Sequence, residues 1–515
     1  ASPAHGAVVE LAWARDRAAP TSHLVALQDG EAIPRQVARI TGIDHRAMRD
    51  ARPVAEVWGE LVRHVPAPTI IHFATFEEKF LRDLHMRLGP DGAFPFELIC
   101  THAIASRLFP DLPRRGLRAI AGYFGSNVGP LRRSAHHVAA TQLVWQALID
   151  ELEELEVRTL AELRSWIDGT PRGKSLARGW PMPKSERAGL PDRPGVYRML
   201  RIDGSLLYVG KARSLKKRVG SYFGKRREIP ERTVEMLSQA RRLEWTETET
   251  PLEAALLEQE EIKARGPRYN VALRADERSV YFATRDLRSI ATSPDGDHRV
   301  GPLADPSVLE GLPELLDALR GRRTAAPVLL SASWGPKDEP LREGIARFAM
   351  RHPEVPLTLR GMLRLGRVLW PRDRDRGDDE AREDDRWRPE SVADMIEDRW
   401  MRAAHVIRQA RWLAVLSESS IAWRDGARQR CLLLERGALE SRSWLAAERT
   451  PPCPRGAGRS ARARLASFDV TVRDRLRVLT TELRRLRDDG ADPRIRTGPG
   501  SVVGGAALGR LLRWV

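Results

Sequence analysis

The sequence predicts an α/β protein of about three domains, and three observations support this. The chain has 515 residues, and a domain commonly takes roughly 100–200 residues. Residues 5–154 alternate short apolar runs with stretches of helical spacing, which is the pattern of α/β folds. Hydrophobic residues make up 42% of the chain and charged residues 30%, so packed cores are feasible.

The first predicted domain covers residues 1–165. Two apolar runs, Gly6–Trp13 and Thr69–Phe73, have the length and composition of strands. Apolar residues at helical spacing predict helices at Val54–Val65, Thr75–Leu88, Leu117–Phe124 and Ala135–Leu155. Strands and helices that alternate in this way predict an α/β domain.

A linker and a compact second domain follow. Residues 166–189 are rich in Gly, Pro and basic residues, which is typical of a linker. Residues 190–285 are predicted to form a small α/β unit. Its first two apolar runs are separated by Asp203-Gly204, a hairpin turn signal, and the second run continues into a basic helix. A further amphipathic helix is predicted at Leu252–Ala264.

The third predicted region, residues 286–515, is mixed and mostly helical, and none of its motifs indicates a function. The charge run at 372–388 is typical of a solvated loop. Asp469–Arg485 alternates apolar and basic residues, so it is either a helix against the core, which we favour, or a basic face on DNA. The clearest predicted elements are helices at Val392–Ser417 and Val470–Leu486 and strands at Ser420–Trp423 and Arg430–Leu434.

The charge balance favours a polyanionic partner. Lys and Arg number 86 against 70 Asp and Glu, a net charge of +16. Nucleic acid is the first candidate partner and an acidic membrane surface the second, although the excess of Arg over Lys is also expected from a GC-rich genome. Residues 211–227 hold eight basic residues and no acid, with Tyr222 and Phe223 interleaved. This mixture of charge and aromatic surface suits a phosphate backbone.

Other compositional signals point to a cytoplasmic protein without a membrane span. The three cysteines, Cys100, Cys431 and Cys453, are too scattered for a disulfide framework or a CxxC metal site. No run of about 18 apolar residues is present. The chain shows no signal segment, and since it does not begin with Met, preceding residues are expected.

An ordered set of motifs in residues 190–285 resembles the GIY-YIG nuclease family. The set comprises Gly195-Val196-Tyr197, Tyr208-Val209-Gly210, Lys211, Arg218, Tyr222, Glu258 and Pro267-Arg268-Tyr269-Asn270. It is most similar to the amino-terminal domain of the excinuclease subunit UvrC and to its single-domain relative Cho. The one departure noted is Ser214, where the family commonly has Asn, and this affects only local helix capping.

The resemblance implies metal-dependent hydrolysis of a DNA phosphodiester. Glu258 is implied to hold one Mg²⁺ or Mn²⁺, and Tyr208, or less favourably Tyr197, to accept a proton from the attacking water. Phenol is a poor base at its usual pKa near 10, so Lys211 and Arg218 are expected to favour phenolate.

Arg218 is further implied to stabilise the transition state, and Tyr222 and Asn270 to orient phosphate or water. Five further residues of the basic run are expected to bind DNA: Lys216, Lys217, Lys225, Arg226 and Arg227.

Each of these residues, taken alone, also has a purely structural interpretation. Tyr197 and Tyr208 could be packing aromatics of the strands. Glu258 could be the partner of a basic side chain, and Asn270 could be a turn residue. The ordered spacing of the whole set is what favours the catalytic interpretation.

Residues 1–155 resemble a DnaQ-like, DEDD-type 3′–5′ exonuclease, which implies an RNase-H-like fold. The resemblance rests on VVELAWA, ITGIDHRAM, TIIHFATFEEKFL, LRAIAGYFG and RRSAHHVAATQLVW. Such an enzyme needs four carboxylates around two metal ions and a histidine that helps to activate water.

Those catalytic groups are largely replaced. The Asp-x-Glu motif would precede residue 1, and in the second motif Phe73 stands for Asn and Glu77 for Asp. In the last motif Arg132 stands for His and His137 for Asp, which removes a charge that two divalent ions need. We therefore expect an exonuclease fold without exonuclease activity, although His136 and His137 are conceivable alternative ligands.

The sequence therefore predicts a GIY-YIG DNA endonuclease that makes a single incision in DNA repair. Its expected partners are DNA and a damage-recognition complex of the UvrA/UvrB kind. Two alternatives stay open. One is an active 3′–5′ exonuclease, and the other is a non-catalytic DNA-binding or scaffold protein.

Overall fold

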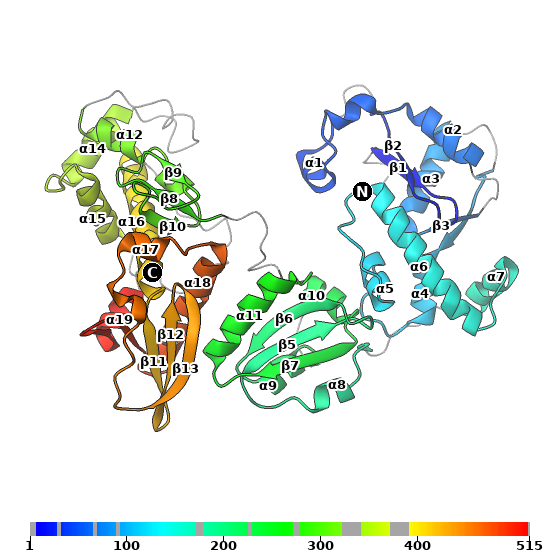
Figure 1. The fold of residues 1–515 in the computed structure, drawn as a ribbon. Helices are drawn as coiled ribbons and strands as arrows, with labels where there is room; N and C mark the ends of the chain where they lie inside the picture. The colour runs from blue at the N-terminus through cyan, green and yellow to red at the C-terminus, as the bar shows by residue number, and fades with distance from the viewer. Residues whose placement is uncertain are drawn as a thin grey trace. The chain divides into compact units, whose positions relative to one another are not determined.

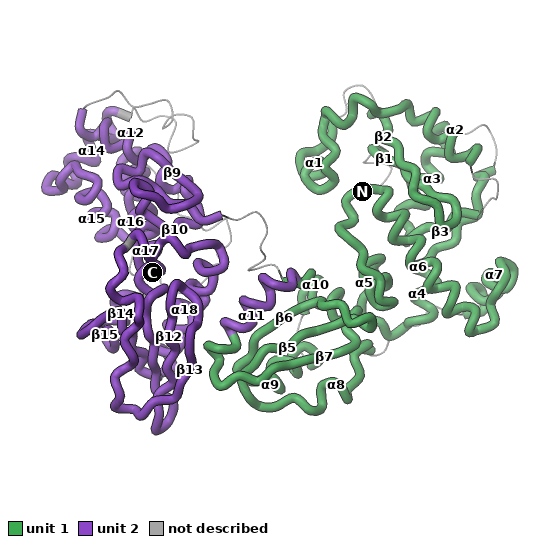
Figure 2. The backbone as a smooth tube through the Cα atoms, viewed as in Figure 1, with its two compact units in different colours: residues 1–254, 267–271 green, residues 255–266, 272–515 purple. Residues whose placement is uncertain are grey.

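The computed structural model describes residues 7–27, 32–64, 69–88, 93–170, 179–224, 229–270, 279–321, 341–370 and 391–512. Contacts divide the chain into two compact units, which Figure 2 shows in different colours. The first comprises residues 1–254 and 267–271, and the second residues 255–266 and 272–515. Within the described ranges, no helix combines the length and the apolar character that crossing a membrane requires.

The amino-terminal part of the first unit is an α/β structure, as predicted (Figure 1). β1 (Glu10–Trp13) pairs antiparallel with β2 (Thr21–Leu24), and β3 (Thr69–His72) pairs parallel with β4 (Glu97–Cys100). The first predicted strand is thus shorter than expected and only half-buried. The helices are α1 (Arg35–Thr41), α2 (Val54–His64), α3 (Ala74–Leu88), α4 (Thr101–Leu108), α5 (Leu117–Tyr123), α6 (Ser134–Glu154) and α7 (Leu160–Gly169), with a 3₁₀ turn at Ala47–Asp50.

Helix α6 organises the core of this part. Its buried side chains, which include Val144 and Leu148, pack with Ile104 of α4 and Ile120 of α5. A smaller apolar cluster forms around Trp58 and Leu84 on α2 and α3. The four predicted helices are confirmed, each within a few residues of its predicted bounds.

The predicted linker at 166–189 is shorter in the structure. Helix α7 continues to Gly169, and residues 171–178 lie outside the described residues. Beyond them, Met182 is buried in the same cluster as Tyr197. A short helix, α8 (Ser185–Ala188), follows. The composition of the segment indicated a loop, but its apolar side chains are part of the next core.

The central part of the first unit is a three-stranded antiparallel sheet with flanking helices. The strands are β5 (Gly195–Leu200), β6 (Leu206–Ala212) and β7 (Arg242–Glu247), in the order β6-β5-β7. Gly204 in the predicted hairpin turn has φ +81°, which favours glycine. The helices are α9 (Leu215–Ser221), α10 (Glu231–Leu237) and α11 (Pro251–Arg265).

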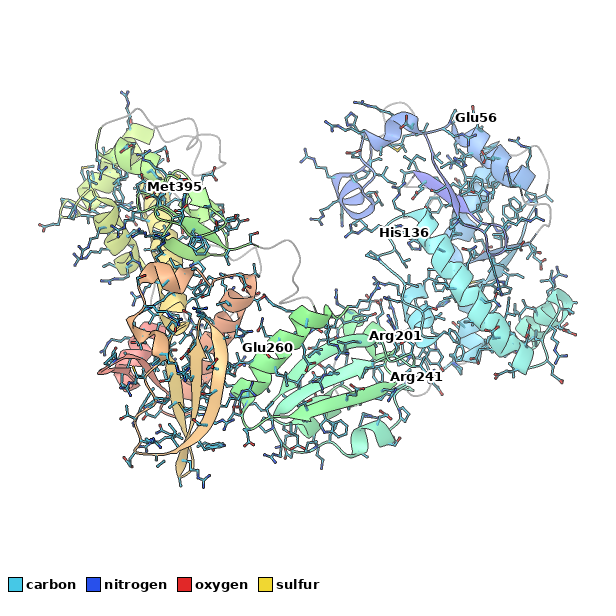
Figure 3. The ribbon with its side chains drawn as sticks, in the orientation of Figure 1. Glu56, His136, Arg201, Arg241, Glu260 and Met395 are labelled. Carbon is cyan, nitrogen blue, oxygen red and sulfur yellow. The ribbon has the colours of Figure 1, made fainter. Side chains whose placement is uncertain are left out.

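The boundary between the two units lies within α11, since residues 251–254 belong to the first and 255–266 to the second. In the second unit, Lys263 Nζ lies 2.8 Å from Asp474 Oδ2, and both side chains are buried. Glu260, labelled in Figure 3, lies 3.5 Å from Arg475. Within the second unit, these ion pairs join residues 255–266 of α11 to α18.

The second unit contains a helical part and two sheets. β8 (Tyr281–Ala283) pairs with β9 (Ile290–Ala291) and β10 (Val300–Leu303), so this unit begins before the predicted boundary at residue 285. The helical part comprises α12 (Leu312–Leu319), α14 (Leu341–Arg351), α15 (Leu359–Leu369) and α16 (Val392–Leu416), with a 3₁₀ turn at Ser307–Leu309. Trp400 on α16 is fully buried in its core.

The second sheet of this unit is antiparallel and five-stranded, in the order β13-β12-β11-β14-β15. The predicted strands correspond to β11 (Ser420–Asp425) and β12 (Arg428–Glu435), and the prediction lacked the other three. Helix α18 (Val470–Asp488) buries Leu476 and Leu479, which confirms the predicted helix against the core. The remaining elements are β13 (Ala438–Ala446), α17 (Ala461–Leu465), β14 (Arg494–Gly498), β15 (Ser501–Val503), α19 (Gly505–Leu512) and a 3₁₀ turn at Arg455–Gly458.

Candidate active site of the central domain

The hairpin β5–β6 brings two tyrosines of the predicted set together. Tyr197 lies opposite Gly210 in the register, and the rings of Tyr197 and Tyr208 are 6.0 Å apart between centroids. A Cβ on Gly210 would lie 2.7 Å from Tyr208 Cε1 and closer still to Tyr197. Glycine at this position is therefore what allows the two phenol rings to pack beside the same stretch of strand.

Tyr197 and Tyr222 share a hydrogen bond of 2.8 Å between their hydroxyl groups. The Tyr197 side chain is 0% exposed, and burial, followed by the neighbouring Tyr208 and Tyr222, raises its pKa well above the usual value of 10. Tyr197 thus stays a neutral phenol at physiological pH. It is placed to orient Tyr222 and is poorly suited to accept a proton.

Arg218 supplies positive charge beside these rings. Its guanidinium carbon lies 5.2 Å from the centroid of the Tyr222 ring, within cation–π range. Burial alone would lower the pKa of Arg218, but the nearby tyrosines outweigh it and raise the pKa above its usual value. The guanidinium is therefore charged and directed at a cluster of phenols.

Tyr208, Arg218 and Tyr222 line a pocket of about 380 Å³ in the central domain. Helix α9 ends at the pocket and α10 forms part of its wall. The lining residues are Tyr208, Arg218, Ser221, Tyr222, Ile229, Pro230, Arg232, Thr233, Met236 and Tyr269. Two arginines and three tyrosines thus border one cavity, which suits an anionic ligand such as a phosphodiester.

Asn270 holds the strand that carries Tyr208. Its Oδ1 accepts a hydrogen bond from the Val209 backbone N at 3.0 Å, and its Nδ2 donates to the Val209 carbonyl at 2.8 Å. The side chain is 6% exposed and does not line the pocket. These two hydrogen bonds join Asn270 to β6 beside Tyr208, and the predicted contact of Asn270 with phosphate or water stays a prediction.

Glu258, the predicted metal ligand, is a half-buried residue of α11. Across the described residues, no group of three or more His, Cys, Asp or Glu side chains is arranged to hold a metal ion. Glu258 offers one carboxylate to a cation, which would take water and substrate oxygens as its other ligands. Mg²⁺ commonly binds in this way, through one or two carboxylates together with phosphates, so the residues present fit that ion.

The predicted DNA-binding residues are only partly described. Lys216 and Lys217 are exposed on α9, where Lys217 Nζ lies 3.6 Å from Asp192. Ser214, which departs from the family's usual Asn, still caps this helix by accepting a hydrogen bond from the Lys217 backbone N. Lys211 is a half-buried residue of β6 opposite Val196. Lys225, Arg226 and Arg227 lie outside the described residues.

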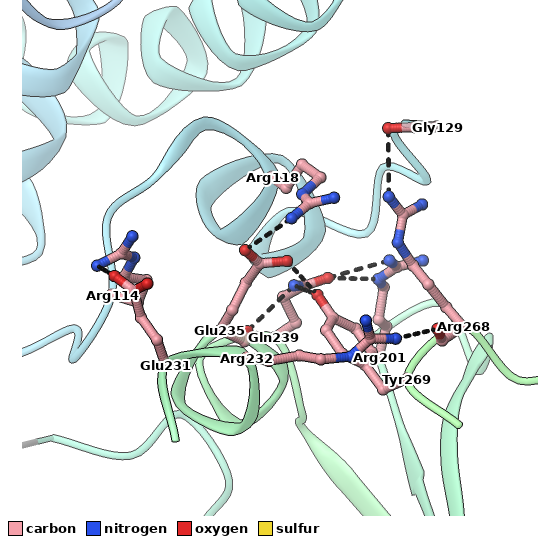
Figure 4. A network of polar contacts seen from close by, with 10 residues as sticks. All are labelled: Arg114, Arg118, Gly129, Arg201, Glu231, Arg232, Glu235, Gln239, Arg268 and Tyr269. Carbon is pink, nitrogen blue, oxygen red and sulfur yellow. Dashed lines mark hydrogen bonds and ion pairs between the residues drawn. The ribbon is translucent and has the colours of Figure 1, made fainter. Parts of the chain in front are cut away.

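The structure adds two residues that the motif did not indicate, Glu235 and Gln239, which bind the hydroxyl of the motif residue Tyr269. The Tyr269 hydroxyl donates to Glu235 Oε1 at 2.7 Å and accepts from Gln239 Nε2 at 2.5 Å (Figure 4). Burial, together with the Glu235 charge, raises the pKa of Tyr269, so its proton is retained. Glu235 and Gln239 lie about 30 residues earlier in the chain, and no local pattern marks them as partners of the motif tyrosine.

The residues predicted to be degenerate exonuclease positions lie in the amino-terminal part. Glu77 is in the first turn of α3, and burial raises the pKa of its carboxyl group to about 7. Arg132 is exposed before α6. His137 is in the first turns of α6, where its Nε2 lies 3.3 Å from the Leu131 carbonyl and burial lowers its pKa. His136, labelled in Figure 3, is exposed on the same helix.

Comparison with known proteins places the central domain. Residues 193–271 match the family model of the UvrC-like GIY-YIG domain. The UvrABC system protein C of Dechloromonas aromatica is 50% identical over 99 residues, which cover 19% of this chain and 16% of that protein. The UvrC amino-terminal endonuclease domain of Thermotoga maritima, solved with magnesium bound, is 32% identical, covers 17% of this chain and 94% of its own, and has a TM-score of 0.16.

A longer match extends outside this domain. A protein of Mycobacterium tuberculosis whose name proposes a bifunctional exonuclease/endonuclease is 30% identical over 312 residues, which cover 59% of this chain and 47% of that protein. The chain therefore spans less than half the length of these curated relatives. Residues 193–271 are a UvrC-like GIY-YIG domain, within a chain whose similarity to an exonuclease/endonuclease protein reaches well beyond it.

Proposed function

We propose that this protein is a metal-dependent DNA endonuclease of the UvrC and Cho type, which makes a single incision during DNA repair. The observation that carries the proposal is the pocket that Tyr208, Arg218 and Tyr222 line together in a UvrC-like GIY-YIG domain. Phosphate-ester hydrolysis needs a proton acceptor for water and positive charge for the transition state. Both kinds of group border this cavity.

Tyr208 is the proposed proton acceptor. It lines the pocket, whereas Tyr197 is fully buried and shares its hydroxyl with Tyr222. The positive charge of Arg218 beside the phenols favours the phenolate form of Tyr208 and stabilises negative charge on the scissile phosphate. Lys211, three residues after Tyr208, adds to the same field, and Tyr222 orients the phosphate.

Glu258 is the proposed ligand of Mg²⁺ or Mn²⁺. The ion would act as a Lewis acid on the phosphate and stabilise the leaving oxygen. Lys216 and Lys217, exposed on α9, would contact the DNA backbone. DNA is thus the proposed substrate, and a damage-recognition complex of the UvrA/UvrB kind is the proposed delivering partner.

The amino-terminal domain is proposed to be an RNase-H-like exonuclease fold without exonuclease activity. Its replaced positions support this, because the half-buried Glu77 has its pKa raised by desolvation and Arg132 carries the wrong charge for a metal ligand. Two divalent ions need several ionised carboxylates close together. The domain then serves in contacts with DNA or with the rest of the protein.

The test is cleavage of a labelled, lesion-bearing duplex with Mg²⁺ or Mn²⁺ by the wild type and by Glu258→Ala. The expected result is an internal nick by the wild type, with none by the variant or in EDTA. Glu260→Ala is a matched control, since Glu260 is on the same helix and pairs with Arg475. It should retain nicking.

The alternative functions give different results in the same experiment. Loss of 3′ ends that survives Glu258→Ala would establish an active exonuclease and overturn the proposal. Salt-sensitive DNA binding without cleavage, for intact, damaged and branched duplexes and with the delivering complex added, would establish a non-catalytic binder.

A further inference from the structure

Helix α10 of the endonuclease domain contacts the exonuclease-like domain through a polar network (Figure 4). Arg118 Nη2 of α5 donates to Glu235 Oε2 at 3.2 Å. Arg114 forms an ion pair with Glu231, and its backbone N donates to Ser238 Oγ at 3.1 Å. Two arginines just before and within α5 therefore hold successive turns of α10.

Close packing joins the same two surfaces. A Cβ on Gly122 of α5 would come within 2.7 Å of Gln239 Cγ and closer to the end of that side chain. The Arg241 guanidinium lies 3.9 Å from the Tyr123 ring centroid. Arg268 donates to Asn127 Oδ1 at 3.3 Å and to the Gly129 carbonyl at 3.2 Å. The contact between the two domains thus includes Arg268, the residue before Tyr269.

The network leads directly into the candidate active site. Glu235 gives one carboxylate oxygen to each side, Oε2 to Arg118 and Oε1 to the hydroxyl of Tyr269. Its side chain is only 17% exposed, so the carboxylate has little water to replace a lost partner. Tyr269 lines the pocket beside Tyr208 and Arg218.

Gln239 is the second hydrogen-bond partner of the Tyr269 hydroxyl, after Glu235. The Gln239 side chain is 1% exposed, donates to the phenol oxygen and accepts two hydrogen bonds from Arg201 at 3.0 and 3.2 Å. The donors and acceptors of this network are thus matched from the partly exposed Arg118 to the buried Arg201 (Figure 4). Because α10 also supplies Arg232, Thr233 and Met236 to the pocket, one helix meets both the domain contact and the cavity.

We propose that the exonuclease-like domain is a positioning element for the endonuclease, and that Glu235 is the positioning residue through which α5 sets α10 and Tyr269 at the pocket wall. The inference rests on the proposed endonuclease function for its effect on catalysis. It assigns the amino-terminal domain a role that needs none of the exonuclease carboxylates.

The test uses the full-length chain with Arg118→Met and the conservative variant Arg118→Lys. Arg118→Met is expected to lower kcat for nicking about fivefold, the worth of roughly one partly buried ion pair, with KM changed less than twofold. Arg118→Lys, which keeps the charge, should recover most of kcat. Arg39→Met is the matched control, because Arg39 is exposed on α1 of the same domain.

A structural readout separates this inference from the proposed function. Amide hydrogen exchange of residues 231–239 is expected to be faster in Arg118→Met than in the wild type and unchanged in Arg39→Met. Equal exchange in Arg118→Met and the wild type would overturn the positioning role whatever the activity. If the wild type does not nick DNA, the proposed function fails, and the exchange experiment still decides whether α5 holds α10.

Discussion

The side chain of Asn270 forms two hydrogen bonds with the backbone of Val209. Its Oδ1 accepts from the Val209 N–H, and its Nδ2 donates to the Val209 carbonyl. Val209 lies between Tyr208 and Gly210, so these two hydrogen bonds hold β6 at the residue that follows Tyr208. We predict that Asn270→Asp destabilises the domain by about 2–3 kcal/mol, because the carboxylate cannot donate to the buried carbonyl and faces it with negative charge. Urea unfolding of both proteins measures the difference.

The chain contains a natural control for that substitution. Asn127 is exposed, and its Oδ1 accepts a hydrogen bond from Arg268. Asn127→Asp makes the same chemical change on the surface and should alter stability by less than about 0.5 kcal/mol. Equal free energies of unfolding for Asn270→Asp and the wild type would contradict the positioning role of Asn270.

The two motif tyrosines should differ in what their hydroxyl groups do. Removing the hydroxyl in Tyr208→Phe is expected to lower kcat about 10²- to 10⁴-fold, since a proton acceptor is lost. Tyr197→Phe removes a buried hydrogen bond with Tyr222, so it should cost about 1 kcal/mol of stability and less catalysis. Single-turnover nicking and urea unfolding of both variants test this. A larger catalytic loss in Tyr197→Phe would reverse the assignment.

The sequence predicts the central domain well because its signals are local. The Asp203-Gly204 turn and the two apolar runs, the second leading into a basic helix, each act within a few residues, and the structure has the hairpin and helix at those positions. Tyr208, Arg218 and Tyr222 also share the predicted neighbourhood. The contacts of Tyr269 with Glu235 and Gln239 depend on tertiary packing, so no periodicity could reveal them.

The missed elements are those whose composition resembles loops. β13 carries polar and charged residues on an edge strand of its sheet, and it lacks the apolar alternation that marks a half-buried strand. The predicted linker contains only a few apolar residues, yet Met182 among them is fully buried. In both cases neighbouring segments supply the packing, and sequence composition alone does not record it.

The basic helix α9 gives a prediction about salt dependence. Lys216 and Lys217 are exposed, and the ion pair of Lys217 with Asp192 lies at the surface, so exchanging it for a DNA phosphate costs little. If both lysines contact the DNA backbone, Lys216→Ala/Lys217→Ala should reduce the slope of log K against log salt by about 2, with weakening on every DNA sequence. Titrations between low and high salt measure the slope. An unchanged slope would show that neither Lys216 nor Lys217 contacts the DNA backbone.

The carboxyl group of Glu77 gives a pH-dependent test of the proposal that the amino-terminal domain is an inactive exonuclease fold. Its pKa rises from the usual 4.5 to about 7, mainly through burial, and its Oε2 has no hydrogen-bond partner among the described residues. The folded state therefore holds this proton more tightly than the unfolded state. Stability from this group is fully present below pH 4.5 and is lost as the pH rises towards 7, because ionisation is then required in a buried position.

Glu77→Gln removes that titration while keeping the shape of the side chain. We predict that the variant and the wild type unfold with similar free energies near pH 4.5, and that the variant is more stable at pH 8 by up to about 3 kcal/mol. Urea unfolding at the two pH values measures this, and parallel pH profiles would contradict it. Added Mg²⁺ provides the second comparison. If it stabilises the wild type at pH 8 but not Glu77→Gln, the carboxylate binds metal, and the active exonuclease becomes the better interpretation of this domain.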